Sequence, residues 1–397
     1  MRFKHAYLAL AALLFASCAA EEPDPFARED KFILEIGPME DQISLFDFYD
    51  DVGLPRAGVA MADGFFFISD GGGRKVARYS SFGDLLFLIF NDETNPEPSG
   101  LRIRTIDDGL MTRWAYSFPF RSPGRIAVDS RRNIFVEEIL PEERHMDDDE
   151  SLALLGAVIL HFDENGSFID YIGQGGRGGL PFPYVVGLQT SADDEIVVTC
   201  FIPGGRDVFW FDENGSPLFI VHVRNETAPA PPGHSDFFAS IDSVFPAPDS
   251  RKLFVKVDYY REVMEPLTGN LVGMEAIASL VWTLNVESGV YESFAQVPFF
   301  EGAGSEWGEA ASIPFSMIGA ARGGSLLFSF PERDGYAIMR MDSSGGGQRR
   351  GNIRIDPSRL IFNSFHLSPE GILSAILADE WTASVSWWRL ESFMRDG

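Results

Sequence analysis

The chain has 397 residues, 45% of them apolar, which is enough for one large domain or two modest ones with a sizeable core. It contains 35 Phe, 39 Gly and 24 Pro, a composition that favours β-structure over helices. The formal net charge of −27 argues against nucleic acid as a partner and against electrostatic docking on an anionic membrane, because both need clusters of Lys and Arg.

Residues 1–17 have the pattern of a cleaved export signal. The basic MRFKH precedes the apolar AYLALAALLFAS, which is too short for a comfortable transmembrane span. Small residues stand just before Cys18, and the segment resembles a bacterial lipoprotein signal, although Phe15 replaces the usual Leu. The resemblance implies that Cys18 becomes the lipidated (palmitate-type) first residue, followed by a tether over 18–30, on the periplasmic face or outer surface of the bacterial cell envelope. The alternative is an ordinary secretory signal with an incidental Cys18.

A six-residue string, FDENGS, occurs at 162–167 and again at 211–216, each time between strand-like runs. Asn-Gly supplies the positive φ that short hairpin turns need. Looser copies lie at 76–90, 280–294 and 337–355, and hairpins of a second kind lie at 59–69, 126–137, 187–200, 243–257, 317–330 and 364–377. Two hairpins per unit indicate units of four strands.

The sixth unit lacks one strand, and the alternating KFILEIG at 31–37 is the candidate to complete it by pairing with 383–393. The sequence therefore predicts an all-β fold over 31–397: a six-bladed β-propeller with four antiparallel strands per blade, whose last blade is closed by the N-terminal strand.

Three segments resemble NHL-type repeats of six-bladed propellers: ISDGGGRKVARYSSFGDLL, RSPGRIAVDSRRNIFVEE and GQGGRGGLPFPYVVGLQTSADDEIVV. The matching positions in the first are Asp70, Arg74, Tyr79 and Gly83. The resemblance is good over 57–223 and weak over 224–397. It implies the fold and no particular activity, because propellers serve as hydrolases, lyases, lactonases and binding platforms.

The expected connections differ between the two faces of the ring. Those joining strands one to two and three to four of each unit are short, and they define the tight-turn face. The others are long at 91–120, 140–157, 224–238, 258–276 and 298–312, and they define the long-loop face. Because long loops on a rigid scaffold commonly carry binding or chemistry, we expect the function on this face.

Aromatic and arginine side chains in or near the long loops are candidate anchors for a protein partner in the cell envelope. They are Phe46, Tyr49, Arg113, Trp114 and Trp307. The alternative is that these side chains pack beneath the loops.

Acidic residues close the second strand of most units: Asp70, Glu138, Asp258, Glu332 and Asp379. If they converge at the mouth of the central channel, their oxygens form a candidate site for a divalent cation such as Ca²⁺. The alternative is that they are solvated acids in an acidic protein. Other chemistry has little support: Cys200 reads as a buried small apolar residue, and His161 and His222 as core or flank positions.

Two functions follow. The favoured one is a membrane-anchored, non-enzymatic binding scaffold that uses its long-loop face. The alternative is a metal-dependent lactonase, hydrolase or lyase at the channel mouth.

Overall fold

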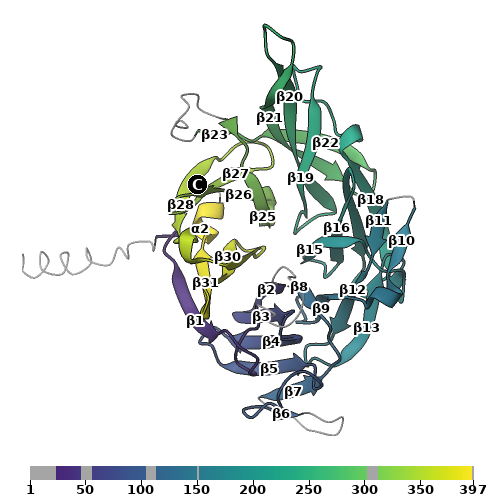
Figure 1. Cartoon of the computed structure of the whole chain (residues 1–397), viewed down its shortest axis with the longest axis vertical. Helices are drawn as coiled ribbons and strands as arrows, with labels where there is room; N and C mark the ends of the chain where they lie inside the picture. The colour runs from purple at the N-terminus through teal and green to yellow at the C-terminus, as the bar shows by residue number, and fades with distance from the viewer. Residues whose placement is uncertain (1–23, 46–55, 104–112, 150–151, 302–311, 396–397) are drawn as a thin grey trace, which may run out of the picture.

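The computed structural model describes residues 24–45, 56–103, 113–149, 152–301 and 312–395. Antiparallel sheets follow one another around a central axis, and Figure 1 shows them as a ring. The prediction of an all-β propeller is confirmed. No helix in the described residues is both long and apolar enough to cross a bilayer.

Six sheets contain four or more strands. Sheet 1 consists of β2 (Ala57–Ala62), β3 (Phe65–Asp70), β4 (Lys75–Ser80), β5 (Leu85–Phe90), β7 (Trp114–Ser117) and β6 (Arg102–Ile103). Sheet 2 consists of β8 (Pro123–Val128), β9 (Ile134–Ile139), β12 (Ala157–Phe162), β13 (Phe168–Gly173) and β14 (Gly176–Arg177). Sheet 3 consists of β15 (Tyr184–Thr190), β16 (Ile196–Ile202), β17 (Gly205–Phe211) and β18 (Pro217–Arg224).

The other three sheets have four strands each. Sheet 4 consists of β19 (Phe238–Pro246), β20 (Lys252–Met264), β21 (Leu271–Asn285) and β22 (Val290–Gln296). Sheet 5 consists of β25 (Ser316–Ala321), β26 (Ser325–Glu332), β27 (Gly335–Asp342) and β28 (Arg349–Arg354). Sheet 6 consists of β29 (Phe362–Leu367), β30 (Ile372–Ala378), β31 (Thr382–Arg389) and β1 (Glu29–Glu35).

The remaining elements are small. Two short ribbons pair β10 (Met146–Asp148) with β11 (Ala153–Leu155) and β23 (Phe300–Glu301) with β24 (Ser312–Ile313). Single helical turns are η1 (Glu142–Arg144), η2 (Asn225–Thr227), η3 (Arg322–Gly324), η4 (Pro357–Arg359) and α2 (Glu391–Met394).

The N-terminal strand completes the last sheet. β1 pairs antiparallel with β31, with Glu29 opposite Trp387 and Glu35 opposite Thr382. Leu34 is 4% exposed whereas its neighbour Ile33 is 63% exposed, so the alternation of this strand buries one side against the core. The expected closing strand is present, two residues earlier than 31–37.

The core is divided among the junctions between sheets. Each of six apolar clusters contains residues of two neighbouring sheets, and the cluster around Leu34, Phe66 and Val385 joins sheet 6 to sheet 1. The apolar contact therefore continues around the whole ring, and the side chains of each sheet are buried on both of its faces.

The repeated FDENGS turns differ from the expected form. Only the glycines have positive φ, at 83° for Gly166 and 76° for Gly215. In each turn the aspartate carboxylate accepts two backbone N–H bonds, from Asn165 and Ser167 in the first copy. Since the register shifts by one residue at Phe162 and at Phe211, each copy is a turn followed by a glycine bulge.

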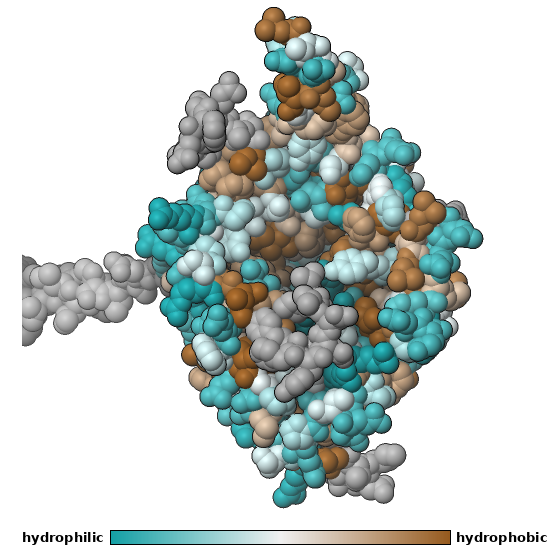
Figure 2. Space-filling view, in the orientation of Figure 1, coloured by the Kyte–Doolittle hydropathy of each residue, from teal (hydrophilic) through white to brown (hydrophobic). Residues whose placement is uncertain are grey.

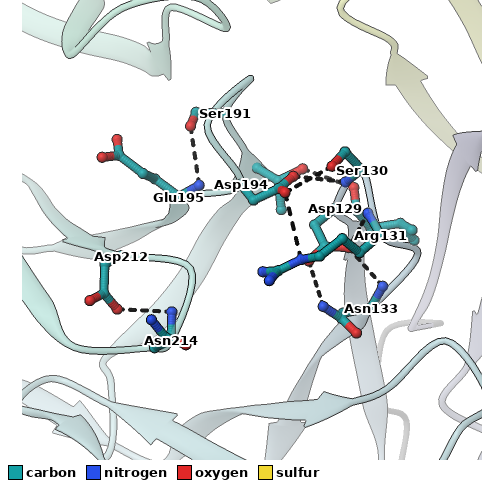
Figure 3. Close-up of polar contacts among 11 residues, drawn as sticks. Asp129, Ser130, Arg131, Asn133, Ser191, Asp194, Glu195, Asp212 and Asn214 are labelled. Atoms are coloured by element: carbon teal, nitrogen blue, oxygen red, sulfur yellow. Dashed lines mark hydrogen bonds and ion pairs between the residues drawn. The ribbon is translucent and has the colours of Figure 1, made fainter.

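Turns of neighbouring sheets are bonded to each other on the tight-turn face. The Asp194 carboxylate accepts hydrogen bonds from the backbone N–H and hydroxyl of Ser130, both at 2.8 Å (Figure 3). The backbone N–H of Ala192 donates to the carbonyl of Pro248, and that of Gly323 donates to the Asp249 carboxylate. The tight-turn face is therefore a bonded rim, and this contrasts with the longer connections opposite.

Candidate functional site

Three of the expected partner-binding residues, Phe46, Tyr49 and Trp307, lie outside the described residues. The other two, Arg113 and Trp114, lie at the start of β7. The prediction that Trp114 anchors a partner is wrong. Its side chain is 8% exposed, its ring packs against Phe87, and its indole N–H donates to the Asn165 carbonyl at 2.7 Å.

The cause is strand pairing that the alternation pattern did not indicate. The connection 91–120 crosses back along the outer edge of sheet 1, where β7 pairs in parallel with β5, and β6 pairs in parallel with β7. This places Trp114 between sheets 1 and 2, where it holds the first FDENGS turn. Arg113 remains at the surface, in an ion pair of 3.1 Å with Asp84.

The five strand-end carboxylates are not gathered into one site. Among the described residues, no three His, Cys, Asp or Glu side chains are close enough to hold a metal ion. Asp70 accepts backbone N–H bonds from Ser44 and Gly73, and Asp379 accepts them from Trp381 and Thr382. Asp379 therefore stabilises its own connection, whereas Asp70 joins the β3–β4 turn to the segment that contains Ser44.

The other three carboxylates are held as locally. Asp258 is buried against the ammonium group of Lys256, at 2.7 and 2.8 Å. Glu332 is half-buried, with the Asn352 amide 3.4 Å away. Glu138 accepts backbone N–H bonds from Arg121, Ser122 and Ile139 at 2.7–3.2 Å.

Glu138 lies at the wall of a hollow on the long-loop face. Two adjoining pockets of about 230 and 300 Å³ share the residues Arg121, Ile139 and Leu140, and together they form what we call the interblade groove. The first pocket is lined mainly by apolar and aromatic side chains, including Phe118, Phe168 and Tyr171. The second is more polar than the first and is lined by residues that include Arg74, Glu142 and His145.

The groove lies where sheets 1 and 2 meet. Its residues come from the β3–β4 turn, the segment before β8, the end of β9, the inserted η1 turn with its flanks, and the outer strands β12 and β13. His145 is fixed there by a contact of 2.8 Å between Nε2 and the Leu140 carbonyl. The long connection 140–157 therefore lines part of the groove.

Three arginines at the groove were not anticipated as site residues: Arg74, Arg121 and Arg144. None of their guanidinium groups has a hydrogen-bond or ion-pair partner within the described ranges. Arg74 also has a φ of 51°, a conformation that glycine usually takes. No motif joins the three, because they come from separate connections.

Burial raises the pKa of Glu138 to about 7, although the three backbone N–H groups favour its charged form. The folded protein thus holds this proton more tightly than the unfolded chain, in which the pKa is near 4.5. The stabilisation by Glu138 is therefore fully present below pH 4.5 and is lost as pH rises through about 7.

Glu138→Gln is expected to remove this dependence. Urea denaturation gives the unfolding free energy of the native protein and of the variant at each pH. The native value minus the variant value should fall by about 3 kcal/mol between pH 4.5 and 8. Glu142→Gln, an exposed site in the same groove, is the control and should follow the native curve. Parallel curves for the native protein and Glu138→Gln would contradict the assignment.

A second feature of the long-loop face is a projecting hairpin. β20 and β21 continue past the ends of the neighbouring strands. The pairing of β19 with β20 ends at Tyr260 of β20, and the pairing of β22 with β21 begins only at Leu280 of β21. We call residues 261–276 the arm. In Figure 1 it stands out beyond the ring, and in Figure 2 hydrophobic residues gather on it.

The arm exposes large apolar side chains that no other described part of the chain covers. Leu267 at its tip is 94% exposed. Five further side chains are between 37% and 61% exposed: Val263, Met264, Leu271, Val272 and Met274. A two-stranded ribbon with this surface has little stability of its own in water.

Cys200 and two of the histidines have structural contacts. The prediction that Cys200 is buried is confirmed, and burial raises the pKa of its thiol well above the usual value. His161 is buried with its ring stacked on Phe135, and His222, on the outer strand β18, contacts the Asp207 carboxylate at 2.8 Å. His366 lies on the inner strand β29, where burial lowers its pKa to about 4.

The solved structures that are similar to this chain are distant from it in sequence. No family model and no curated protein matches the chain. An α-L-arabinofuranosidase from Fusarium graminearum, solved with an iminosugar inhibitor, is 10% identical, with 93% of this chain and 99% of that chain covered and a TM-score of 0.48. A gluconolactonase from Xanthomonas campestris is 14% identical, with 83% and 85% covered and a TM-score of 0.37.

The β-propeller domain of the Trilobed protease from Pyrococcus furiosus is 12% identical to this chain. The two cover 84% of this chain and 95% of that domain, with a TM-score of 0.37. At these values no activity carries over from these proteins.

Proposed function

We propose that this protein is a lipid-anchored, extracytoplasmic binding scaffold that holds a protein partner of the cell envelope through the arm on its long-loop face. The observation that carries the proposal is the arm itself, an apolar two-stranded ribbon whose outer edges have no strand partner in the described ranges. Open edges expose unpaired backbone N–H and C=O groups, and these can pair with a strand supplied by another protein.

The charges of the arm indicate the kind of partner. Glu262, Glu265 and Glu275 accompany a single basic residue, Arg261, which is paired with Glu275 at 2.7 Å. The whole chain carries −27, so a second copy or an anionic lipid surface would be repelled. We therefore propose a partner that presents an apolar strand or groove flanked by basic residues.

The proposal includes the anchor and the architecture. Cys18 carries the lipid, the residues between Cys18 and β1 are the tether, and the six sheets act as six NHL-like blades. β1 begins at the tight-turn end of sheet 6, because it is antiparallel to β31. A tether that enters there turns the tight-turn face toward the membrane and the long-loop face away from it.

Replacing Leu267 with serine is expected to weaken partner capture at least about tenfold, or 1.4 kcal/mol, because it removes an apolar contact at the tip of the arm. Native and variant lipoproteins are crosslinked in membranes of the source organism, and the captured proteins are quantified by mass spectrometry. The affinity is then measured with the purified partner. Leu180→Ser, at a leucine that is 55% exposed, is the matched control.

Equal capture by native protein and Leu267→Ser would overturn the proposal. Arm-dependent self-association in sedimentation, or arm-dependent binding to vesicles of the native lipids, would instead assign the arm to a second copy or to the membrane. Loss of lipid labelling in Cys18→Ser tests the anchor separately.

The alternative is a hydrolase or lyase. The feature that favours it is Glu138, a groove carboxyl with a pKa of about 7, which suits proton transfer near neutral pH. An enzyme would lose turnover in Glu138→Gln, whereas a scaffold would keep its capture of the partner.

A further inference from the structure

We propose that the interblade groove binds a small organic anion, whose charged group lies against Arg121 and whose apolar part lies against the aromatic side chains of the first pocket. This site is separate from the arm, which belongs to another sheet. The two proposals can therefore succeed or fail independently.

The guanidinium groups at the groove are available to a ligand. Several arginines elsewhere are held by carboxylates, such as Arg177 by Asp170 at 2.8 Å and Arg251 by Glu195 at 2.6 Å. Arg74, Arg121 and Arg144 have no such contact within the described ranges, although acidic residues outnumber basic ones by 59 to 32. The planar fork of a guanidinium matches carboxylate, phosphate and sulfate groups, so an anion is the complementary ligand.

The two acidic residues at the groove repel a bound anion only weakly. Both oxygens of Glu138 already accept backbone N–H bonds, so this carboxylate faces peptide donors that neutralise much of its field. Glu142, the other acid at the groove, is exposed to solvent, where water and salt screen it.

The lining of the first pocket indicates the chemistry of the uncharged part of the ligand. The Phe118 ring lies 5.1 Å from that of Phe168, which is 46% exposed, and Tyr171 lines the same pocket. Aromatic walls favour a flat ring or an apolar chain. Because Arg121 lines both pockets, one molecule can contact the arginine and the aromatic wall together.

The size of the groove and the charge of the protein limit the ligand. Pockets of about 230 and 300 Å³ suit a small molecule. A long polyanion would extend over the surface of a chain with a net charge of −27 and be repelled there. The ligand is thus a compact aromatic or apolar molecule with one carboxylate, phosphate or sulfate group.

Isothermal titration of the folded, signal-free protein tests this with simple probes. Phenyl phosphate, phenyl sulfate and benzoate carry both features, inorganic phosphate carries only the charge, and phenol carries only the ring. We expect at least one of the three aromatic anions to bind one to one, at least about tenfold more tightly than inorganic phosphate or phenol.

Two variants locate the site. Arg121→Gln should weaken the aromatic anion at least about tenfold without changing the melting temperature, whereas Arg333→Gln, an exposed arginine on the same face, should not. Phe168→Ala should weaken the aromatic anion more than inorganic phosphate, and Phe82→Ala, at a ring 87% exposed, should change neither.

Equal affinity in the native protein and Arg121→Gln would overturn the proposal. So would the absence of saturation by all three aromatic anions at about 10 mM, which corresponds to a binding free energy weaker than about 3 kcal/mol. Neither result would affect arm-dependent capture of a protein, so failure here is distinguishable from failure of the scaffold function.

Discussion

Leu34→Ala is expected to lower the unfolding free energy by about 2–5 kcal/mol. Leu34 is 4% exposed in the cluster that joins sheet 6 to sheet 1, and its truncation leaves a cavity where the ring closes. Since the other strands of sheet 6 lie more than 320 residues away in sequence, as Phe362 begins β29, the contacts of Leu34 hold the two ends of the domain together. Denaturant unfolding followed by tryptophan fluorescence measures the loss.

The adjacent residue provides the control for this prediction. Ile33 shares the strand and the backbone pairing but is 63% exposed, so Ile33→Ala should change the unfolding free energy by no more than about 0.5 kcal/mol. Similar losses in both variants would mean that β1 contributes through its backbone alone and that the alternation of the strand is unimportant.

The second large effect is expected at Lys256, whose side chain is fully buried beside Asp258 and lies 3.7 Å from Asp242. Burial raises the pKa of Asp258, and the ammonium group of Lys256 opposes that shift. Lys256→Met leaves a buried carboxylate without its counter-charge, at a cost of about 3–5 kcal/mol at neutral pH. Urea denaturation at pH 7 measures it.

The pH dependence distinguishes a lost counter-charge from simple mispacking. Without Lys256 the folded-state pKa of Asp258 rises further. The loss of unfolding free energy in Lys256→Met should therefore become smaller as pH falls and the Asp258 carboxyl becomes protonated. Lys256→Met combined with Asp258→Leu should be less destabilised than Lys256→Met alone. A deficit that is equal at pH 4 and pH 7 would contradict the assignment.

Local patterns were sufficient to predict the elements that depend on local chemistry. Alternating residues marked the closing strand, and the Asn-Gly pairs marked the two FDENGS turns. The conformation of the turns was predicted incompletely, because positive φ was expected of Asn165 and Asn214 as well, whereas only the following glycines adopt it. In each turn the aspartate carboxylate accepts backbone N–H bonds that a tighter turn would satisfy with its own carbonyl groups.

Which strands lie side by side after a long connection could not be inferred from local patterns. Whether Trp114 faces solvent or the neighbouring sheet depends on β7 lying beside β5, and no feature of 91–120 by itself indicates that register. The strand-end acids were correctly located at the ends of strands, but their partners are backbone N–H groups, the Asn352 amide and two lysines, Lys75 and Lys256. The groove arginines come from three connections that only the folded ring brings together.

The closing strand also determines how the domain responds to force. A pull on the residues before Glu29 is directed along β1, away from the tight-turn face, while the long-loop face would be held by whatever it binds. The pairs from Glu29–Trp387 to Glu35–Thr382 are then strained together in shear, and cannot open one after another as a zipper does. A domain pulled between a membrane and a partner would thus be loaded on the ladder that joins its first strand to its last.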